Sequence, residues 1–413
     1  MDNLATAGKR SRFSFERILW SLALALFFTI SMNSDWRMEY ILWYGSLAVV
    51  LVAYLAAFHN KVLLTDLSFF AWFLSFVGIG LLSLVWSLSV SSGMDIIKSL
   101  VVFFVVLFLI HCSAKLGFDV NKILKLYFLA TLINSVYVLF AIDIEQLGEV
   151  QLGTGLLGGW NGNSIGFMTA QGVLIGYYLS NMTKRKLEKL LYIISCFLLS
   201  VLTIYTGSRT AFLVLVVELI LYFCLCKPSK IIRNAFISIL ILICAVYLVM
   251  NVDSFYEVLG TRLEGLFALL GGTGKVDSSA SIRDIFIKNG QKWFSERPIF
   301  GFGINNYQIL NHGATGRLTY AHNNFIELAV DLGIVGLIWY YSAYVYLMWK
   351  LFKYIKKSRL YAFLLSALMA SLLAQYGTVS YYGFYQNFLL LLCFFAVTCG
   401  KRGYEFERKQ GLE

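Results

Sequence analysis

Long apolar runs recur along almost the whole chain and decide what it can fold into. A backbone that crosses hydrocarbon must satisfy its own hydrogen bonds, and a helix of about 20 apolar residues does so while spanning a bilayer. The chain is therefore predicted to be an all-α integral membrane protein with about twelve transmembrane helices. The runs lie near residues 18–33, 40–58, 67–88, 97–113, 124–142, 164–181, 190–206, 210–226, 234–250, 330–349, 360–379 and 382–399.

The composition agrees with a chain whose solvent is mostly lipid. Of its 413 residues, 59% are hydrophobic and only 14% are charged, which is too little polar surface to coat a water-soluble globule. Basic residues precede the first run, as in a signal peptide, but Met32 to Asp35 after it is not a small-residue cleavage site. We therefore expect an uncleaved first span.

The distribution of positive charge predicts the orientation. Short cytoplasmic loops carry an excess of Lys and Arg. If both termini are cytoplasmic, 24 of the 34 Lys and Arg residues fall in cytoplasmic segments. The formal net charge of +11 is then a topology signal and not a nucleic-acid footprint. We expect no nucleic-acid partner.

This orientation divides the chain into four parts. Residues 1–250 hold nine spans with short loops, 251–321 form a large extracytoplasmic loop, 322–400 hold the last three spans, and 401–413 are a cytoplasmic tail. Long loops in compact proteins are usually functional or disordered. Part of this one is predicted to be helical, because one stripe at helical spacing ends before Pro298: Ile282, Ile285, Phe286, Asn289 and Trp293.

Two arginines at the predicted outer face could bind a phosphorylated ligand. Arg209 follows Gly207 and Ser208 at the junction of the seventh and eighth spans, and Arg283 lies on the loop helix. A guanidinium stays charged and presents a planar fork of donors that matches phosphate oxygens. Taken singly, Arg209 is equally explained as an interfacial residue that contacts lipid headgroups, and Arg283 as a solvated charge. Brought close together, the two would form a site for a diphosphate.

His322 is one of only 4 histidines and stands at the outer boundary of the tenth span, within the sequence Ala321 to Glu327. A neutral imidazole there can accept a proton from a sugar hydroxyl near physiological pH, which is the task of a general base in glycosyl transfer. A histidine packed and hydrogen-bonded in the interface is the alternative interpretation.

The other candidate residues carry weaker signals. Asn163 opens the sixth span, where its amide could bind sugar hydroxyls or cap the helix. Gly333 and Gly336 are by default helix-packing glycines, and Pro298 to Gly303 is expected to be a plain turn and not a phosphate loop. The outer segments contain no HExxH motif or carboxylate cluster, so we expect no bound metal and no cofactor.

Together these features resemble the family of O-antigen ligases and O-antigen or capsule polysaccharide polymerases. The motifs that carry the resemblance run from about Asn161 to Gly336, and the rest of the chain is similar by topology only. They are Gly207-Ser208-Arg209, Arg283 followed by Trp293, Pro298 with Gly301 and Gly303, and above all His322-Asn323, nine residues, then Gly333-x-x-Gly336.

The resemblance implies a GT-C-like membrane fold and a metal-independent, inverting glycosyl transfer at the outer face of the bacterial cytoplasmic membrane. The donor would be an undecaprenyl-diphosphate-linked glycan, whose diphosphate Arg209 and Arg283 hold. His322 would take the proton from the acceptor glycan. Asn323 and Glu327 are expected to orient the imidazole or the sugar, with Asn163 and Trp293 as further sugar-binding or supporting residues. A flippase and a chain-length regulator are further partners that the resemblance suggests, besides membrane lipids.

The preferred prediction is a polysaccharide polymerase, which joins repeat units en bloc. The close alternative is a ligase that moves finished polymer to lipid A-core or another envelope acceptor. A flippase or transporter of lipid-linked oligosaccharide is the rival from another class, but it would be expected to place charged groups along several spans. A cell-wall glycan polymerase would use an outer-loop Asp as its base, and no such residue can be assigned.

Overall fold

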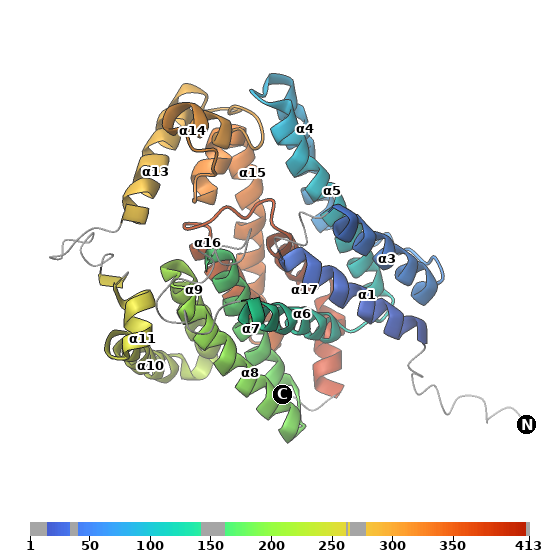
Figure 1. The fold of residues 1–413 in the computed structure, drawn as a ribbon. Coiled ribbons are helices and arrows are strands. Elements are labelled where there is room, and N and C mark those ends of the chain that lie inside the picture. Colours follow the sequence, from blue (N-terminus) through green and yellow to red (C-terminus); the bar gives the residue numbers. More distant parts are fainter. Residues whose placement is uncertain (1–14, 34–39, 142–161, 262, 265–277, 410–413) are drawn as a thin grey trace, which may run out of the picture.

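The computed structural model describes residues 15–33, 40–141, 162–261, 263–264 and 278–409, and within these ranges every element is a helix. The all-α prediction is confirmed for this part of the chain (Figure 1). Each of the twelve predicted runs overlaps one long helix. These are α1 (Phe15–Met32), α3 (Tyr40–Phe58), α4 (Ser68–Ser83), α5 (Val90–Lys115), α6 (Val120–Ala141), α7 (Gly162–Met182), α8 (Lys186–Tyr205), α9 (Arg209–Leu225), α10 (Ile231–Asn251), α15 (Asn324–Tyr354), α16 (Arg359–Ala374) and α17 (Phe384–Lys409).

Eight helices in the described ranges are long and apolar enough to cross a membrane: α1, α3, α4 with its extension η1 (Leu84–Trp86), α5, α6, α8, α10 and α15. The helix α16 and the apolar part of α17 are shorter, and α7 and α9 do not meet the same criteria. Large apolar side chains also point outward, among them Phe140 (87% exposed) and Ile232 (85% exposed). Such side chains are expected where helices face lipid. The protein is therefore a multi-pass membrane protein.

Short helices connect the long ones. A single turn, η3 (Pro228–Lys230), precedes α10, and α11 (Asp253–Phe255) and η4 (Tyr256–Gly260) follow it. The predicted loop helix is present as α13 (Ser278–Glu296), and a further helix, α14 (Tyr307–Thr315), follows. In Figure 1, α13 and α14 lie beside one end of α15.

The apolar face of α13 packs against α14, α15 and the segment between them. Phe286 and Trp293 are buried in a cluster with Tyr307, Ala321 and Val330. Ile285, which was predicted to lie on the same stripe, is instead 49% exposed. The buried face is thus narrower than the predicted stripe, because α13 touches the bundle along one edge.

The helix α15 is broken at Gly333, and the segment from Pro298 to Gly303 fills the break. In a continuous helix the amides of Ile334 and Val335 would bond the carbonyls of Val330 and Asp331. Here these amides donate to Pro298 O and Ile299 O at 2.8 and 3.3 Å, and the two carbonyls accept from the amides of Phe302 and Gly303 at 2.9 and 2.8 Å. The segment 298–303 is therefore inserted into the hydrogen-bonded backbone of α15. The sequence predicted a plain turn for this segment and a helix-packing role for Gly333, and neither prediction included the insertion.

Two glycines make this arrangement possible. Gly333 has φ 64° and ψ −165°, a conformation that is essentially restricted to glycine. Gly301 has φ 67°, and a Cβ atom there would lie 2.5 Å from the carbonyl oxygens of Val330 and Asp331. The close approach of two backbones thus depends on positions without side chains.

The carboxylate of Asp331 fixes the next stretch of the same loop. Its Oδ1 accepts from the amides of Asn306 and Tyr307 at 2.9 and 2.7 Å, and its Oδ2 accepts from the amide of Asn305 at 2.9 Å and from the Tyr381 hydroxyl at 3.0 Å. Four donors give both oxygens of this fully buried carboxyl group hydrogen-bond partners. The loop, α15 and the segment before α17 therefore meet at one anchor.

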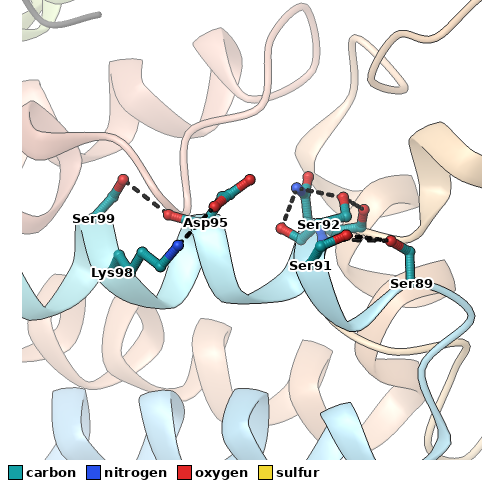
Figure 2. Close-up of polar contacts among 7 residues, drawn as sticks. Ser89, Ser91, Ser92, Asp95, Lys98 and Ser99 are labelled. Atoms are coloured by element: carbon teal, nitrogen blue, oxygen red, sulfur yellow. Dashed lines mark hydrogen bonds and ion pairs between the residues drawn. The ribbon is translucent and has the colours of Figure 1, made fainter. Parts of the chain in front are cut away.

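The same loop is also attached to the N-terminal turn of α5. The Ser89 amide donates to Asn306 Oδ1 at 2.8 Å, and the Asn305 side-chain amide donates to the Ser92 carbonyl at 2.9 Å. Figure 2 shows the polar first turns of α5: Ser89 and Ser91 bond each other, and Asp95 pairs with Lys98. The hydroxyl of Ser92 donates to the loop at Asn305 O. The polar residues at the start of α5 thus have structural partners, and the loop is part of the bundle.

Candidate functional site

His322 stands in a strained turn directly before α15. Its φ of 53° lies in the left-handed region, which non-glycine residues enter rarely and mostly where surrounding structure holds them. Asn323 holds it from one side: its Oδ1 accepts from the amides of Phe325 and Ile326 and so caps α15. Glu327 holds it from the other, since its Oε2 accepts from the Ala321 amide at 2.6 Å. The imidazole is thereby fixed between two anchored positions.

Aromatic rings enclose the imidazole, and a cation lies near it. The Tyr320 ring centroid lies 4.1 Å from that of His322, and the Phe286 ring is stacked at 6.2 Å. Burial and then the positive charge of Arg283 lower the pKa of His322 from 6.5 to about 4. Its Nδ1 is buried and has no hydrogen-bond partner within the described ranges. The imidazole is therefore neutral near pH 7 and able to accept a proton.

Arg283 reaches this position because of α13. It lies one helical turn before Phe286, on the same side of the helix, and Phe286 is buried in the cluster with Ala321. The structure therefore brings Arg283 and His322 together, although they are 39 positions apart in the sequence.

Arg209 is the first residue of α9 and is half-buried. Ser208 caps this helix: its Oγ accepts from the Ala211 amide at 3.2 Å and donates to Asn163 Oδ1 at 2.6 Å. Asn163 lies inside the first turn of α7, which begins at Gly162, so it does not act as the N-cap that was one of its two expected roles. It instead ties α7 to the turn that carries Arg209. The amides at the start of α9, together with the guanidinium, favour an anion.

The connection between α16 and α17 links the Arg209 turn to the His322 turn. Gly377 packs directly against Thr210, so closely that a Cβ atom there would lie 2.7 Å from the Thr210 side chain. On the other side, the Asn324 amide donates to the Gln375 carbonyl at 2.8 Å, and Asn324 Oδ1 accepts from the amide of Ser380 at 2.9 Å. Both turns thus lie at the same end of the bundle, against one connecting segment.

The remaining predicted site residues have supporting positions. Trp293 is buried and packs edge-on against Tyr307 with ring centroids 5.3 Å apart. Asn323 and Glu327 are also buried, and their described contacts fix the backbone around His322 and not the imidazole itself. Sequence reasoning missed Asp331 and Asn305, because a carboxylate inside a predicted span and an amide in a loop give no signal until their distant partners are known.

No group of three or more His, Cys, Asp or Glu side chains in the described ranges is arranged to hold a metal ion. The chemistry that these residues present is that of a neutral base beside one cation, with a second cation at a helix N-terminus.

Comparison with known families identifies the region that holds these residues. A family model described as O-antigen ligase matches residues 194–341, so the chain contains a domain of this family. The matched region runs from α8 through the loop into α15 and includes Arg209, Arg283 and His322. No curated protein matches the sequence.

Proposed function

We propose that this chain, which contains an O-antigen ligase domain, is a polysaccharide polymerase that transfers undecaprenyl-diphosphate-linked repeat units onto a growing O-antigen, capsule or exopolysaccharide chain. The observation that carries the proposal is the neutral His322, held in a strained turn beside Arg283 within the matched domain. A neutral base beside a fixed cation suits a reaction in which a hydroxyl is deprotonated while a diphosphate leaves.

In the proposed reaction Arg209, Arg283 and the amides at the start of α9 bind the donor diphosphate. The charge that builds on the leaving diphosphate is stabilised by these groups, so no metal ion is required. His322 removes the proton from the acceptor hydroxyl, whose oxygen attacks the anomeric carbon and displaces the diphosphate in one step. A single displacement inverts the configuration at that carbon.

The electrostatic effect of Arg283 on His322 gives substrate binding a second effect. With the site free of anion, the Arg283 charge holds the pKa of His322 down. A bound diphosphate offsets that charge, so it makes the imidazole a stronger base at the moment when the reaction needs one. Asn323 and Glu327 act by holding the turn on which His322 stands.

The proposal places the protein in the bacterial cytoplasmic membrane with about twelve spans, both termini in the cytoplasm and the site outside. The positive-inside distribution of Lys and Arg supports this orientation. Its partners are then the lipid-linked glycan, the glycan acceptor and, in the pathway, a flippase and a chain-length regulator.

A ligase that transfers finished polymer to lipid A-core or another acceptor is the second candidate, and the description of the matched family model favours it. Both functions use the same donor chemistry. They differ in the acceptor, which the glycans that accumulate without the enzyme would reveal.

The test is to delete the gene, complement with wild type, His322→Ala or Arg209→Ala, and resolve the surface and lipid-linked glycans by size. His312→Ala is the matched control, because His312 is exposed on α14. Single repeat units on lipid indicate a polymerase, and full-length polymer on undecaprenyl diphosphate indicates a ligase. Unchanged glycan in cells with normal amounts of both site variants would refute the assigned roles.

A further inference from the structure

A cavity of about 230 Å³ lies inside the helix bundle, between α1, α6, α7, α9, α16 and α17. Its lining includes polar side chains at membrane-helix positions, where polar groups are costly and need a reason. They are Ser31, Gln171, Glu218, Ser371 and Gln386.

Three of these side chains present buried polar atoms that have no hydrogen-bond partner in the described part of the chain. They are Glu218 Oε1, Gln386 Nε2 and Ser31 Oγ, on residues that are 1%, 3% and 8% exposed. Buried polar groups are normally paired, and an isolated exception calls for an explanation. Three such residues, from three different helices, line one cavity, which marks it as a candidate ligand site.

The lining defines the chemistry of that ligand. It combines a carboxyl, two carboxamides and hydroxyls with the rings of Tyr127, Phe167 and Phe384, and it includes no Lys, Arg or His. Without a cation it does not suit a phosphate, whereas hydrogen-bond groups together with aromatic rings suit a ring with several hydroxyls. A cavity of about 230 Å³ has room for one sugar ring.

The cavity adjoins the candidate site. Thr378 and Ser380 form part of its wall, and they belong to the connecting segment whose other contacts are with Asn324 and, beside His322, with Tyr320. On the α7 side Ser164 lines the cavity, next to Asn163, which bonds Ser208. The cavity is therefore bounded by segments that also contact the His322 and Arg209 turns.

We propose that this cavity is a subsite for one uncharged sugar ring of the glycan, with Glu218, Gln386 and Ser31 as its hydrogen-bond partners. The proposal rests on the proposed glycan transfer. The ring belongs either to the donor unit or to the end of the acceptor chain, which share this chemistry and which kinetics distinguishes.

The first experiment measures transfer by the purified full-length protein with the host's lipid-linked repeat unit. Glu218→Gln and Gln386→Leu preserve side-chain size and are expected to raise the KM for one substrate at least tenfold, with kcat changed less than threefold. A rise for the donor assigns the cavity to the donor ring, and a rise for the acceptor assigns it to the acceptor end. Tyr222→Phe is the matched control, because it removes a buried polar group from the same helix as Glu218, and Tyr222 does not line the cavity.

A second measurement separates this proposal from the proposed function. Saturation-transfer NMR with the methyl glycosides of the host glycan's sugars reports binding without any reaction, and the signal is expected in wild type and Tyr222→Phe and to fall at least fivefold in the two cavity variants. If wild type transfers no glycan, the proposed function fails while this measurement still judges the cavity. Unchanged KM values and unchanged NMR signals in well-folded Glu218→Gln and Gln386→Leu would overturn the subsite.

Discussion

Adding one methyl group at Gly333 tests how the loop is held to α15. Gly333→Ala places a Cβ atom in a conformation that costs non-glycine residues about 1–3 kcal/mol, and it drives that atom into the Ile299 backbone. A cost of about 1 kcal/mol shifts the equilibrium toward the undocked loop by roughly 5-fold, and a cost of about 3 kcal/mol shifts it by roughly 150-fold. The four backbone hydrogen bonds of the break, each worth about 0.5–1.5 kcal/mol net, are lost as the loop leaves.

The measurement is hydrogen exchange of the amides of Phe302, Gly303, Ile334 and Val335 in detergent-solubilised protein, together with glycan transfer. The four amides are expected to exchange faster by the same factor, because they are released in one opening event. Gly313→Ala is the control: it is the same change on the helix α14, where a Cβ atom would have no neighbour within 4 Å. If Gly333→Ala exchanged and reacted like Gly313→Ala, the insertion of the loop into α15 would be wrong.

Three further outcomes are expected. Burial and the charge of Arg283 together lower the pKa of His322 from 6.5 to about 4, and burial is the larger cause. Arg283→Met removes the charge, so the pKa of His322 is expected to rise while staying below 6.5, and the acid limb of the pH profile of kcat/KM is expected to move to higher pH. An unmoved limb would contradict the electrostatic effect of Arg283 on His322. Asn323→Ala removes the cap of α15 and is expected to cost about 0.5–2 kcal/mol of stability, measured by thermal unfolding. Asn323→Ser keeps a capping oxygen and is expected to retain most of that stability. Equal losses in both variants would contradict the capping role. Dialysis against EDTA is expected to leave transfer activity within about twofold, because the two arginines stabilise the leaving diphosphate, and recovery of lost activity with Mg²⁺ would count against that mechanism.

The long helices could be predicted from the sequence because hydrocarbon leaves an apolar run of about 20 residues only one way to pair its backbone. The start of α15 could not be predicted in this way. Its first turns contain Glu327 and Asp331, which a hydropathy argument assigns to the surface, so the run was predicted to begin at residue 330 and the helix begins at Asn324. Both side chains are buried: Asp331 accepts hydrogen bonds from amides of the distant segment 305–307, and Glu327 accepts one from the amide of Ala321 in the turn before α15.

The three charged or titratable residues of the candidate site could be proposed from the sequence because their residue types suit a diphosphate or a base and because all three are predicted to lie at the outer face. Their grouping was not derivable from residue types, since Arg209, Arg283 and His322 come from separate segments. The role of Gly333 was also hidden: small residues spaced at Gly-x-x-Gly indicate helix packing far more often than a helix break. Only the carbonyl and amide partners contributed by residues 298–303 distinguish the two.

The insertion of residues 298–303 into α15 has a consequence for exchanging parts between proteins of this kind. The two pieces complete each other's backbone pairing, so neither is a module that can be moved alone. A chimera that takes a foreign loop but keeps its own α15 joins two halves of one hydrogen-bonded unit that were never matched. Acceptor specificity, if it resides in the loop, is therefore transferable only with the stretch from Pro298 to Val335 taken whole.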